Sequence, residues 1–211
     1  MTHFTKKNIS ELPKLERMHL INSCGGVKSG NLIGTISQEG TTNLAIFNSV
    51  IHLGSNPPML SFMLRPITVD RDTYENLKDT KQFTVNHIHE SFVDKAHQTS
   101  ANYDKGISEF KEVGLSEEYI KDFKAPFVKE SLIKMGCEFI NEYFIEENGC
   151  RLIIGEIQHL LFPSEIQEKD GLLNLSKAKS AGIIGLDGYL STELMERFAY
   201  ARPGQDIKAL N

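Results

Sequence analysis

The stretch NLAIFNSVIHLGSNPPMLSFMLRPITVDRDTYENL, residues 43–77, contains two runs of strand-forming residues and then changes abruptly to polar residues. The two runs, 43–53 and 59–64, are rich in aliphatic and aromatic side chains, and the Pro-Pro pair between them forces an extended break. Another strand is predicted over residues 31–37, before a Gly-containing turn. Because short links join these neighbouring strands, we predict that they pair in an antiparallel arrangement.

The polar tripeptide Arg71-Asp72-Thr73 follows these strands directly. Asp72 has the character of a helix N-cap, and Glu75 three residues later completes a capping-box pattern. The N–H groups at a helix start favour phosphate, Arg71 adds a cation able to form paired hydrogen bonds, and Thr73 adds a hydroxyl donor. Arg65, at the end of the preceding strand, is a candidate second cation. A surface arginine beside an ordinary capped helix explains the same residues, so both interpretations stay open at this point.

The rest of the chain predicts a mainly β protein with helical insertions, an α+β arrangement. A strand over 82–89 is followed by short helices and loops in 91–124. Residues 132–162 form a predicted long β-hairpin around an Asn-Gly turn, which is the strongest turn signal in the chain. After the strand-like piece AGIIGL, residues 191–201 predict a helix or an extended arm.

Composition and charge exclude several classes of protein. The net charge of −5 leaves no general basic field for a nucleic acid. The first 30 residues lack the apolar core of a signal peptide, and no stretch approaches the ~20 apolar residues of a membrane span, so we expect a cytoplasmic location without membrane contact. There is also no G-x-S-x-G, H-E-x-x-H, Walker or G-x-G-x-x-G motif in the chain.

We predict that the three cysteines, Cys24, Cys137 and Cys150, are ordinary buried thiols in the reduced state. If the Asn148-Gly149 turn has two residues, position 137 faces position 160, so Cys137 and Cys150 are not disulfide partners.

His87 and His89 are the only residues that raise the question of a metal site. At i and i+2 on a strand they point to the same face, as metal ligands do, but no other ligand cluster accompanies them. A polar strand face near solvent or a ligand is therefore the favoured interpretation, and a metal-dependent enzyme is the alternative. No metal site is predicted.

The order of these segments resembles the flavin reductase-like family, which has the FMN-binding split β-barrel fold of flavoredoxin-type proteins. The segments that carry the resemblance are LIGTISQEGTTNLAIFNSVIHLGSNPPMLSFMLRP, RDTYENLKDTKQFTVNHI, SEF, APFVKES and LIIGEI. They cover residues from about 30 to 160, and the tail GLDGY…YARPG looks like the C-terminal part of the same group. The resemblance implies one FMN-binding split-barrel domain over 1–211, with an N-terminal helical segment in 1–28 and a C-terminal arm in 163–211.

The resemblance also implies which residues contact the flavin. The Asn-x-Ala segment would approach the ring through its backbone, a strand serine would contribute a hydroxyl, and the tripeptide would hold the phosphate. Arg71 stands where many relatives have lysine, which keeps the charge. The matching positions are Asn43, Leu44, Ala45, Ser49, Arg65, Arg71, Asp72, Thr73 and Asn86.

His52, His97 and Ser100 are further candidate flavin contacts. His97 and Ser100 lie on a segment that, by the resemblance, reaches over the cofactor. A packed helical histidine explains His97 equally well, so both alternatives stay open.

The resemblance implies an NAD(P)H:flavin oxidoreductase in which NADH or NADPH is a transient donor of hydride to FMN, and a homodimer with FMN near the subunit interface. No single catalytic residue is predicted, because hydride transfer belongs mainly to the flavin ring. The alternative is a non-catalytic FMN-binding electron carrier or flavin sensor.

Overall fold

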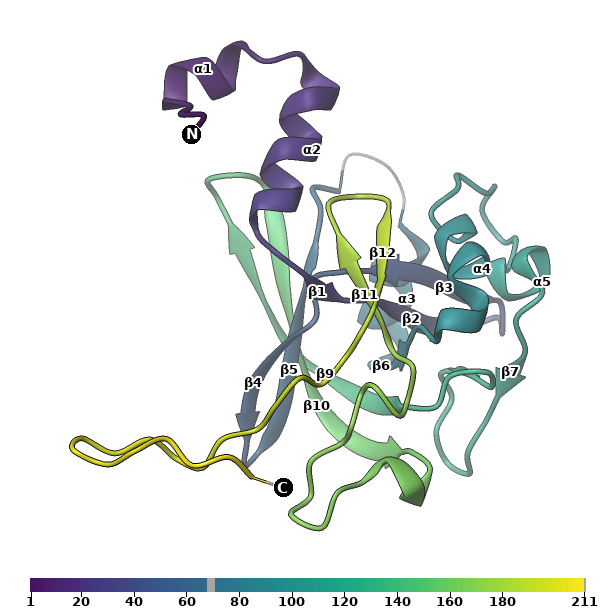
Figure 1. The fold of residues 1–211 in the computed structure, drawn as a ribbon. Helices are drawn as coiled ribbons and strands as arrows, with labels where there is room; N and C mark the ends of the chain where they lie inside the picture. Colours follow the sequence, from purple (N-terminus) through teal and green to yellow (C-terminus); the bar gives the residue numbers. More distant parts are fainter. Residues whose placement is uncertain (68–70, 211) are drawn as a thin grey trace.

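The computed structural model describes residues 1–67 and 71–210 (Figure 1). The helices are α1 (Lys6–Glu11), α2 (Lys14–Cys24), α3 (Asp72–Thr80), η1 (Glu90–Phe92), α4 (Val93–Gln98), α5 (Glu109–Val113) and η2 (Ser164–Ile166). The strands are β1 (Lys28–Ser29), β2 (Asn31–Ile36), β3 (Thr42–Phe47), β4 (Ile51–Ser55), β5 (Pro58–Leu64), β6 (Gln82–His87), β7 (Glu117–Glu118), β8 (Phe127–Val128), β9 (Lys134–Ile145), β10 (Cys150–Leu161), β11 (Ala181–Ile184) and β12 (Gly188–Ser191).

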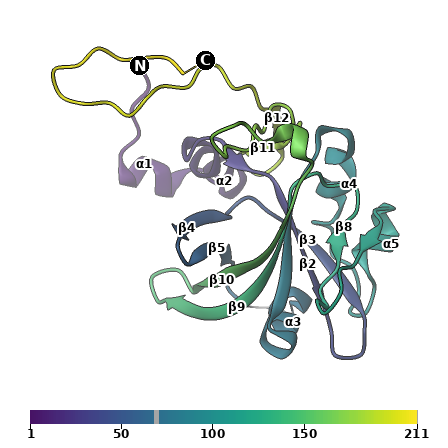
Figure 2. The ribbon, with the colours of Figure 1, turned by 90° about the horizontal axis from the view of Figure 1, so that it is seen from below.

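A seven-stranded antiparallel sheet in the order β3-β2-β6-β9-β10-β5-β4 curves into an open barrel (Figure 2). Its edge strands, β3 and β4, follow each other in the chain, yet the described residues show no pairing between them. The predicted antiparallel split β-barrel is therefore confirmed.

The predicted single strand over 43–53 is wrong, because the structure breaks it into β3 and β4. Ser49 lies at the break, where its hydroxyl donates to the carbonyl of Met63 at 3.3 Å and accepts the N–H of Met63 at 3.1 Å. The chain changes its pairing partner at this contact: β3 pairs with β2, whereas β4 pairs with β5. The opening of the barrel follows from this change of partner.

The barrel interior is filled by aromatic and aliphatic side chains. Phe62 lies between Phe47 and Phe83, with edge-to-face ring contacts at centroid distances of 5.1 and 5.4 Å. Gly155 makes room for this group, since a Cβ there would lie 2.4 Å from the Phe83 ring. Leu77 joins the same cluster from α3, which thereby packs against the barrel. The barrel is thus a packed core, and α3 is anchored to it.

A second core cluster lies between β2, β3 and the short helices. Phe110 of α5 and Phe92 of η1 pack with Leu32 of β2 and Leu44 of β3. The β11–β12 hairpin joins this layer through Ile183 and pairs with β1. Helices α4 and α5 therefore cover β3 from outside the barrel, as Figure 2 shows.

The predicted long hairpin is confirmed as β9 and β10, but its turn is longer than predicted. Ile145 pairs with Cys150, and the register shifts at two points, so Cys137 faces Ile157 instead of residue 160. The two cysteines are still not partners, and all three thiols are free. Only Cys137 is buried, whereas Cys24 is exposed, so the prediction of three buried thiols is wrong.

Both ends of the chain extend from the body of the molecule. Helices α1 and α2 contain no buried residue. At the other end, the stretch predicted as a helix or an arm is an arm, closed on itself by a bridge between Phe198 and Ala209. In Figure 2 both ends lie on the same side of the barrel. The division into one domain over 1–211, with segments 1–28 and 163–211, stays a prediction.

In residues 1–67 and 71–210 we find no helix with the length and apolar character needed to cross a membrane.

Candidate functional site

Helix α3 begins one residue earlier than the capping-box pattern predicts. Arg71 is the N-cap residue, with an extended backbone (φ −135°, ψ 100°), and Asp72 is the first helical residue. The carbonyl of Arg71 accepts the N–H groups of Tyr74 and Glu75 at 2.9 and 3.1 Å. The Glu75 carboxylate pairs with Lys105 at 2.8 Å. The predicted capping box is therefore wrong. The N-cap residue is Arg71, whose guanidinium group places a positive charge at the start of the helix.

Two predicted site residues, Asn43 and Thr73, meet inside the structure. The Asn43 amide of β3 donates to the Thr73 hydroxyl of α3 at 3.0 Å and to the Thr35 hydroxyl at 3.3 Å. Asn76 also donates to Thr35, at 3.1 Å. These side chains are buried, so the bonds anchor the start of α3 to the barrel. Within the described residues, the Thr73 hydroxyl has no acceptor for its own proton.

Arg71 carries a buried donor without a partner. Its Nε is enclosed, and the residues described in the structure offer it no acceptor. An unpaired buried N–H costs about 1–3 kcal/mol, more for a charged group, so an acceptor from outside the chain would relieve it. A phosphate oxygen is the acceptor that guanidinium geometry suits best. Arg65 is exposed and lies just after β5, at the start of the segment that connects β5 to α3.

The backbone of β3 is held by a carboxylate that was not predicted. Glu109 of α5 is buried, and its Oε2 accepts the N–H of Leu44 at 2.8 Å. Burial raises the pKa of Glu109, and Asp72 raises it further, while the N–H groups of Leu44 and of Glu109 itself oppose the rise. Both the side chain and the N–H of Leu44 therefore have partners within the protein: the side chain lies in the core, and the N–H donates to Glu109. The contact of Leu44 with a flavin stays a prediction, as does that of the half-buried Ala45 beside it.

Glu109 could not be found from the sequence, because it lies 65 positions from Leu44. A glutamate in the first turn of a short helix is typical of ordinary capping. Nothing local distinguishes a carboxylate that reaches across to a neighbouring strand.

The structure places three other predicted residues away from this cluster. Asn86 is fully buried in β6 and is surrounded by its own hydrogen bonds. Ser49, in the link between β3 and β4, is hydrogen-bonded to Met63 of β5, and His52 is exposed on edge strand β4. A direct cofactor contact stays a prediction for each of them.

His97 and Ser100 lie at the exposed end of α4. The Ser100 hydroxyl donates to the carbonyl of His97 at 2.7 Å, and the His97 ring forms a hydrogen bond with Tyr189 of β12. Both side chains are exposed, and a flavin contact stays a prediction for Ser100 and for His97. The His97 ring reaches from α4 to the β11–β12 hairpin.

The histidines considered for a metal site have other partners. His87 is hydrogen-bonded to Ser180, and burial lowers its pKa to about 4. His89 is hydrogen-bonded to Ser91. Among the described residues, no group of three or more His, Cys, Asp or Glu side chains is arranged to hold a metal ion.

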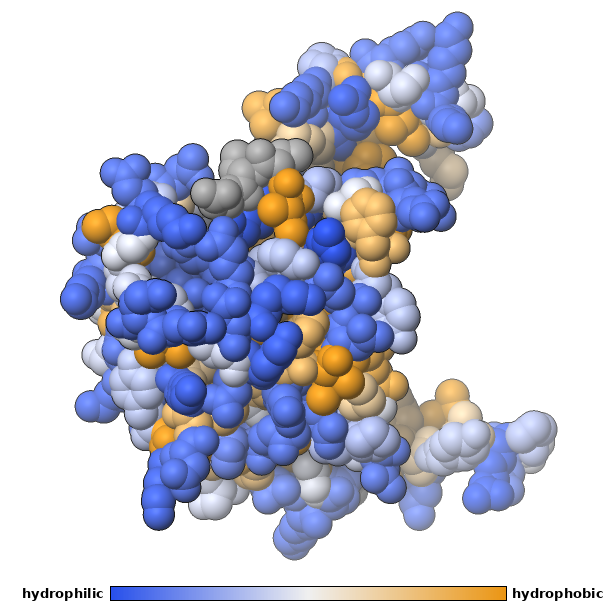
Figure 3. Space-filling model, turned by 180° about the vertical axis from the view of Figure 1, so that it is seen from behind, coloured by the Kyte–Doolittle hydropathy of each residue, from blue (hydrophilic) through white to orange (hydrophobic). Residues whose placement is uncertain are grey.

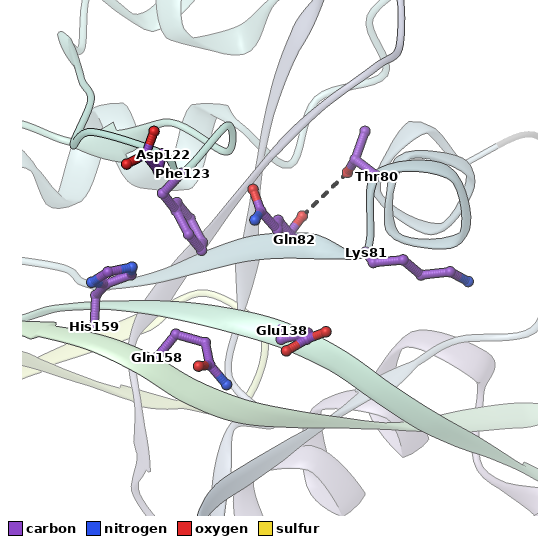
Figure 4. Close-up of a pocket in the computed structure, with 8 residues that line it drawn as sticks. All are labelled: Thr80, Lys81, Gln82, Asp122, Phe123, Glu138, Gln158 and His159. Carbon is purple, nitrogen blue, oxygen red and sulfur yellow. Dashed lines mark hydrogen bonds between the residues drawn. The ribbon is translucent and has the colours of Figure 1, made fainter.

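A separate cavity of about 350 Å³ lies beside the C-terminal end of α3 (Figure 4). His159 stands edge-to-face against Phe123 there, and polar side chains form most of the remaining wall. The lining residues are Thr80, Lys81, Gln82, Asp122, Phe123, Glu138, Gln158 and His159. None of them is a predicted site residue, so the cavity is distinct from the start of α3.

The open antiparallel barrel, with a cationic helix start beside edge strand β3, has the architecture of a split β-barrel protein. The family model described as flavin reductase like domain matches residues 25–181, and the chain belongs to this family. It is 30% identical over 160 residues to a protein of Methanothermobacter thermautotrophicus, a match covering 74% of this chain and 73% of the relative.

Two crystal structures show the same fold. A candidate flavin reductase with a split barrel domain from Shewanella frigidimarina NCIMB 400 is 43% identical, with a TM-score of 0.92, and the match covers 95% of this chain and 100% of the other. Nitrilotriacetate monooxygenase component B from Bacillus cereus is 22% identical, with a TM-score of 0.81 and coverages of 92% and 97%. The family and its structures support a function of the flavin reductase or oxidoreductase type.

Proposed function

We propose that the chain binds FMN, with the phosphate at the start of α3, and transfers hydride from NADH or NADPH to the flavin. The observation that carries the proposal is the buried, unpaired Nε of Arg71, which lies two residues from Thr73, a buried hydroxyl with a proton to donate. The two groups offer donors of the type that a phosphate accepts. The Asn43–Thr73 bond keeps the second donor in place.

When bound, FMN would supply the ring that accepts the hydride. The chain's own contribution is positioning: Arg71, Thr73 and the helix start would hold the phosphate, while β3 would border the ring. Glu109 binds the backbone of β3 at Leu44, and this hydrogen bond restrains the strand in the absence of a ligand. Such preorganisation lowers the cost of binding and of orienting the reactants.

Spectroscopy and a comparison of ligands test the proposal. The purified protein should show flavin absorbance bands, or should bind added FMN saturably. Riboflavin, which lacks the phosphate, should bind more weakly than FMN. NADH or NADPH oxidation should then depend on added FMN. Equal affinity for FMN and riboflavin would show that the site does not bind the phosphate. Bound flavin without any NAD(P)H oxidation would favour the alternative function of an electron carrier or flavin sensor.

We also propose that the protein is a cytoplasmic homodimer. Apolar side chains are exposed on the arm, where Met195 and Tyr200 are 94% and 90% exposed, and on edge strand β4 at Ile51 and Leu53. The end of the arm folds back on itself through one isolated bridge, and such a segment is marginal in water without a surface to pack against. Figure 3 shows apolar side chains on the face of the body between the two projecting ends. A second copy of the chain would cover both the arm and this face.

Replacing Met195 and Tyr200 together by serine should weaken this dimer. Light scattering of the wild-type protein is expected to give twice the chain mass of 23.7 kDa, whereas the double variant should dissociate at low micromolar concentration. Replacing the arm's polar Asp206 and Lys208 by alanine is the matched control and should leave the mass unchanged. If the double variant stays dimeric at every concentration, the arm is not part of the interface.

A further inference from the structure

His97 and Tyr189 form a pair that joins two elements far apart in the chain. Nδ1 of His97, on α4, lies 2.9 Å from the Tyr189 hydroxyl on β12, and 92 positions separate the two residues. Their rings stand nearly perpendicular, at 85° and a centroid distance of 5.7 Å. A hydrogen bond combined with an edge-to-face contact restricts both the position and the rotation of the imidazole ring.

The pair lies beside the end of β3, the strand that would border the flavin ring. Tyr189 and Ile46 of β3 pack against the same core cluster. The loop after β3 is tied to the β11–β12 turn, where the Asn48 amide donates to the carbonyl of Gly185 at 3.3 Å. In Figures 1 and 2 the β11–β12 hairpin and α4 lie on the same side of β3. The pair therefore belongs to the surroundings of the candidate site.

The contact with Tyr189 leaves the other ring nitrogen of His97, Nε2, for a different partner. Burial raises the pKa of Tyr189 to about 12, and the nearby Asp187 contributes, so the phenol keeps its proton at neutral pH. A phenol that donates to Nδ1 selects the tautomer with hydrogen on Nε2. Among the described residues, His97 and Asp187 are titratable groups that act on the phenol, and Asp187 in turn lies 4.0 Å from His19 of α2.

We propose that Tyr189 is a positioning residue of the candidate site, which holds His97 so that its Nε2–H donates to the bound flavin or to the nicotinamide donor. The inference rests on the proposed function and extends it to a residue outside the predicted site. The proposed contact requires a hydrogen-bond acceptor on the ligand, such as a ring carbonyl or an amide oxygen, within reach of His97 on α4. Ser100 stabilises the end of α4 through its bond to the carbonyl of His97, which helps to fix the position of the imidazole.

Nitrogen NMR of the His97 ring in the full-length protein tests the positioning. The wild-type ring should be locked in one tautomer, and Tyr189→Phe should convert it to a mixture. FMN alone should shift the Nε2 resonance if the flavin is the acceptor, whereas a shift that needs added NAD⁺ would identify the nicotinamide. Saturable FMN binding with no change at His97, with or without NAD⁺, would overturn the inference and leave the proposed function intact. Absence of FMN binding would overturn both.

A double-mutant cycle on NAD(P)H oxidation gives a second readout. Tyr189→Phe and His97→Ala should each lower kcat/KM by about 3- to 10-fold, the value of one hydrogen bond, and the double variant should be no worse than His97→Ala. Tyr103→Phe is the matched control, because that phenol contacts the neighbouring Gln98 of α4 at 3.3 Å. Multiplicative losses in the double variant, at unchanged thermal stability, would contradict the coupling.

Discussion

Replacing Arg71 by alanine is expected to weaken FMN binding by about 1.5–3 kcal/mol, or roughly 10- to 150-fold. Arg71 is the N-cap residue of α3, and its enclosed Nε has no acceptor among the described residues. The substitution would remove a permanent cation and its paired hydrogen bonds from the proposed phosphate position. Quenching of flavin fluorescence during a titration measures the dissociation constant directly.

Two comparisons separate a phosphate contact from a general effect of charge. Arg71→Lys keeps the charge but loses the planar donor geometry, so it should fall between the wild type and the alanine variant. Lys129→Ala, an exposed cation in the loop after β8, should leave the affinity unchanged. Riboflavin binding should also be indifferent to Arg71→Ala. An unchanged dissociation constant for FMN in the alanine variant would sink the assignment of the phosphate to α3.

Replacing Asn86 by alanine is expected to lower the free energy of unfolding by about 2–4 kcal/mol, because buried partners would lose their hydrogen bonds. The Asn86 amide donates to the carbonyl of Leu32 at 3.1 Å and to the Thr84 hydroxyl at 2.8 Å. Its oxygen accepts the buried N–H of Val128 at 3.0 Å. One side chain thus ties β2, β6 and β8 together. Urea denaturation of the two proteins measures the difference.

The same variant distinguishes a structural role of Asn86 from the predicted cofactor contact. A structural role leaves the FMN dissociation constant of the folded variant close to the wild-type value, while a direct contact lowers affinity with little loss of stability. Asn141→Ala, the same change at an exposed position of β9, is the control and should cost less than about 0.5 kcal/mol. Wild-type stability together with weakened FMN binding would support the direct contact.

Local residue patterns were sufficient to predict most of the barrel. The apolar run before the Pro-Pro pair corresponds to β3 and β4, the run after it lies in β5, and the Asn-Gly turn lies between β9 and β10 as expected. These elements depend on side-chain periodicity and turn residues, which act over a few positions. The break between β3 and β4 escaped prediction because the Ser49 hydroxyl only bends the chain once Met63 of β5 is beside it.

The candidate site divides in the same way. The sequence by itself determined that a cation, a carboxylate and a hydroxyl stand together at a helix start, since Arg71, Asp72 and Thr73 are consecutive. Only the tertiary structure decided which residues contact the predicted site residues: Asn43 contacts Thr73 across 30 positions, Glu109 contacts Leu44 across 65, and Tyr189 contacts His97 across 92. A hydrogen bond acts over about 3 Å of space, whatever the distance along the chain. Its partners are therefore known only after the strands and helices have packed.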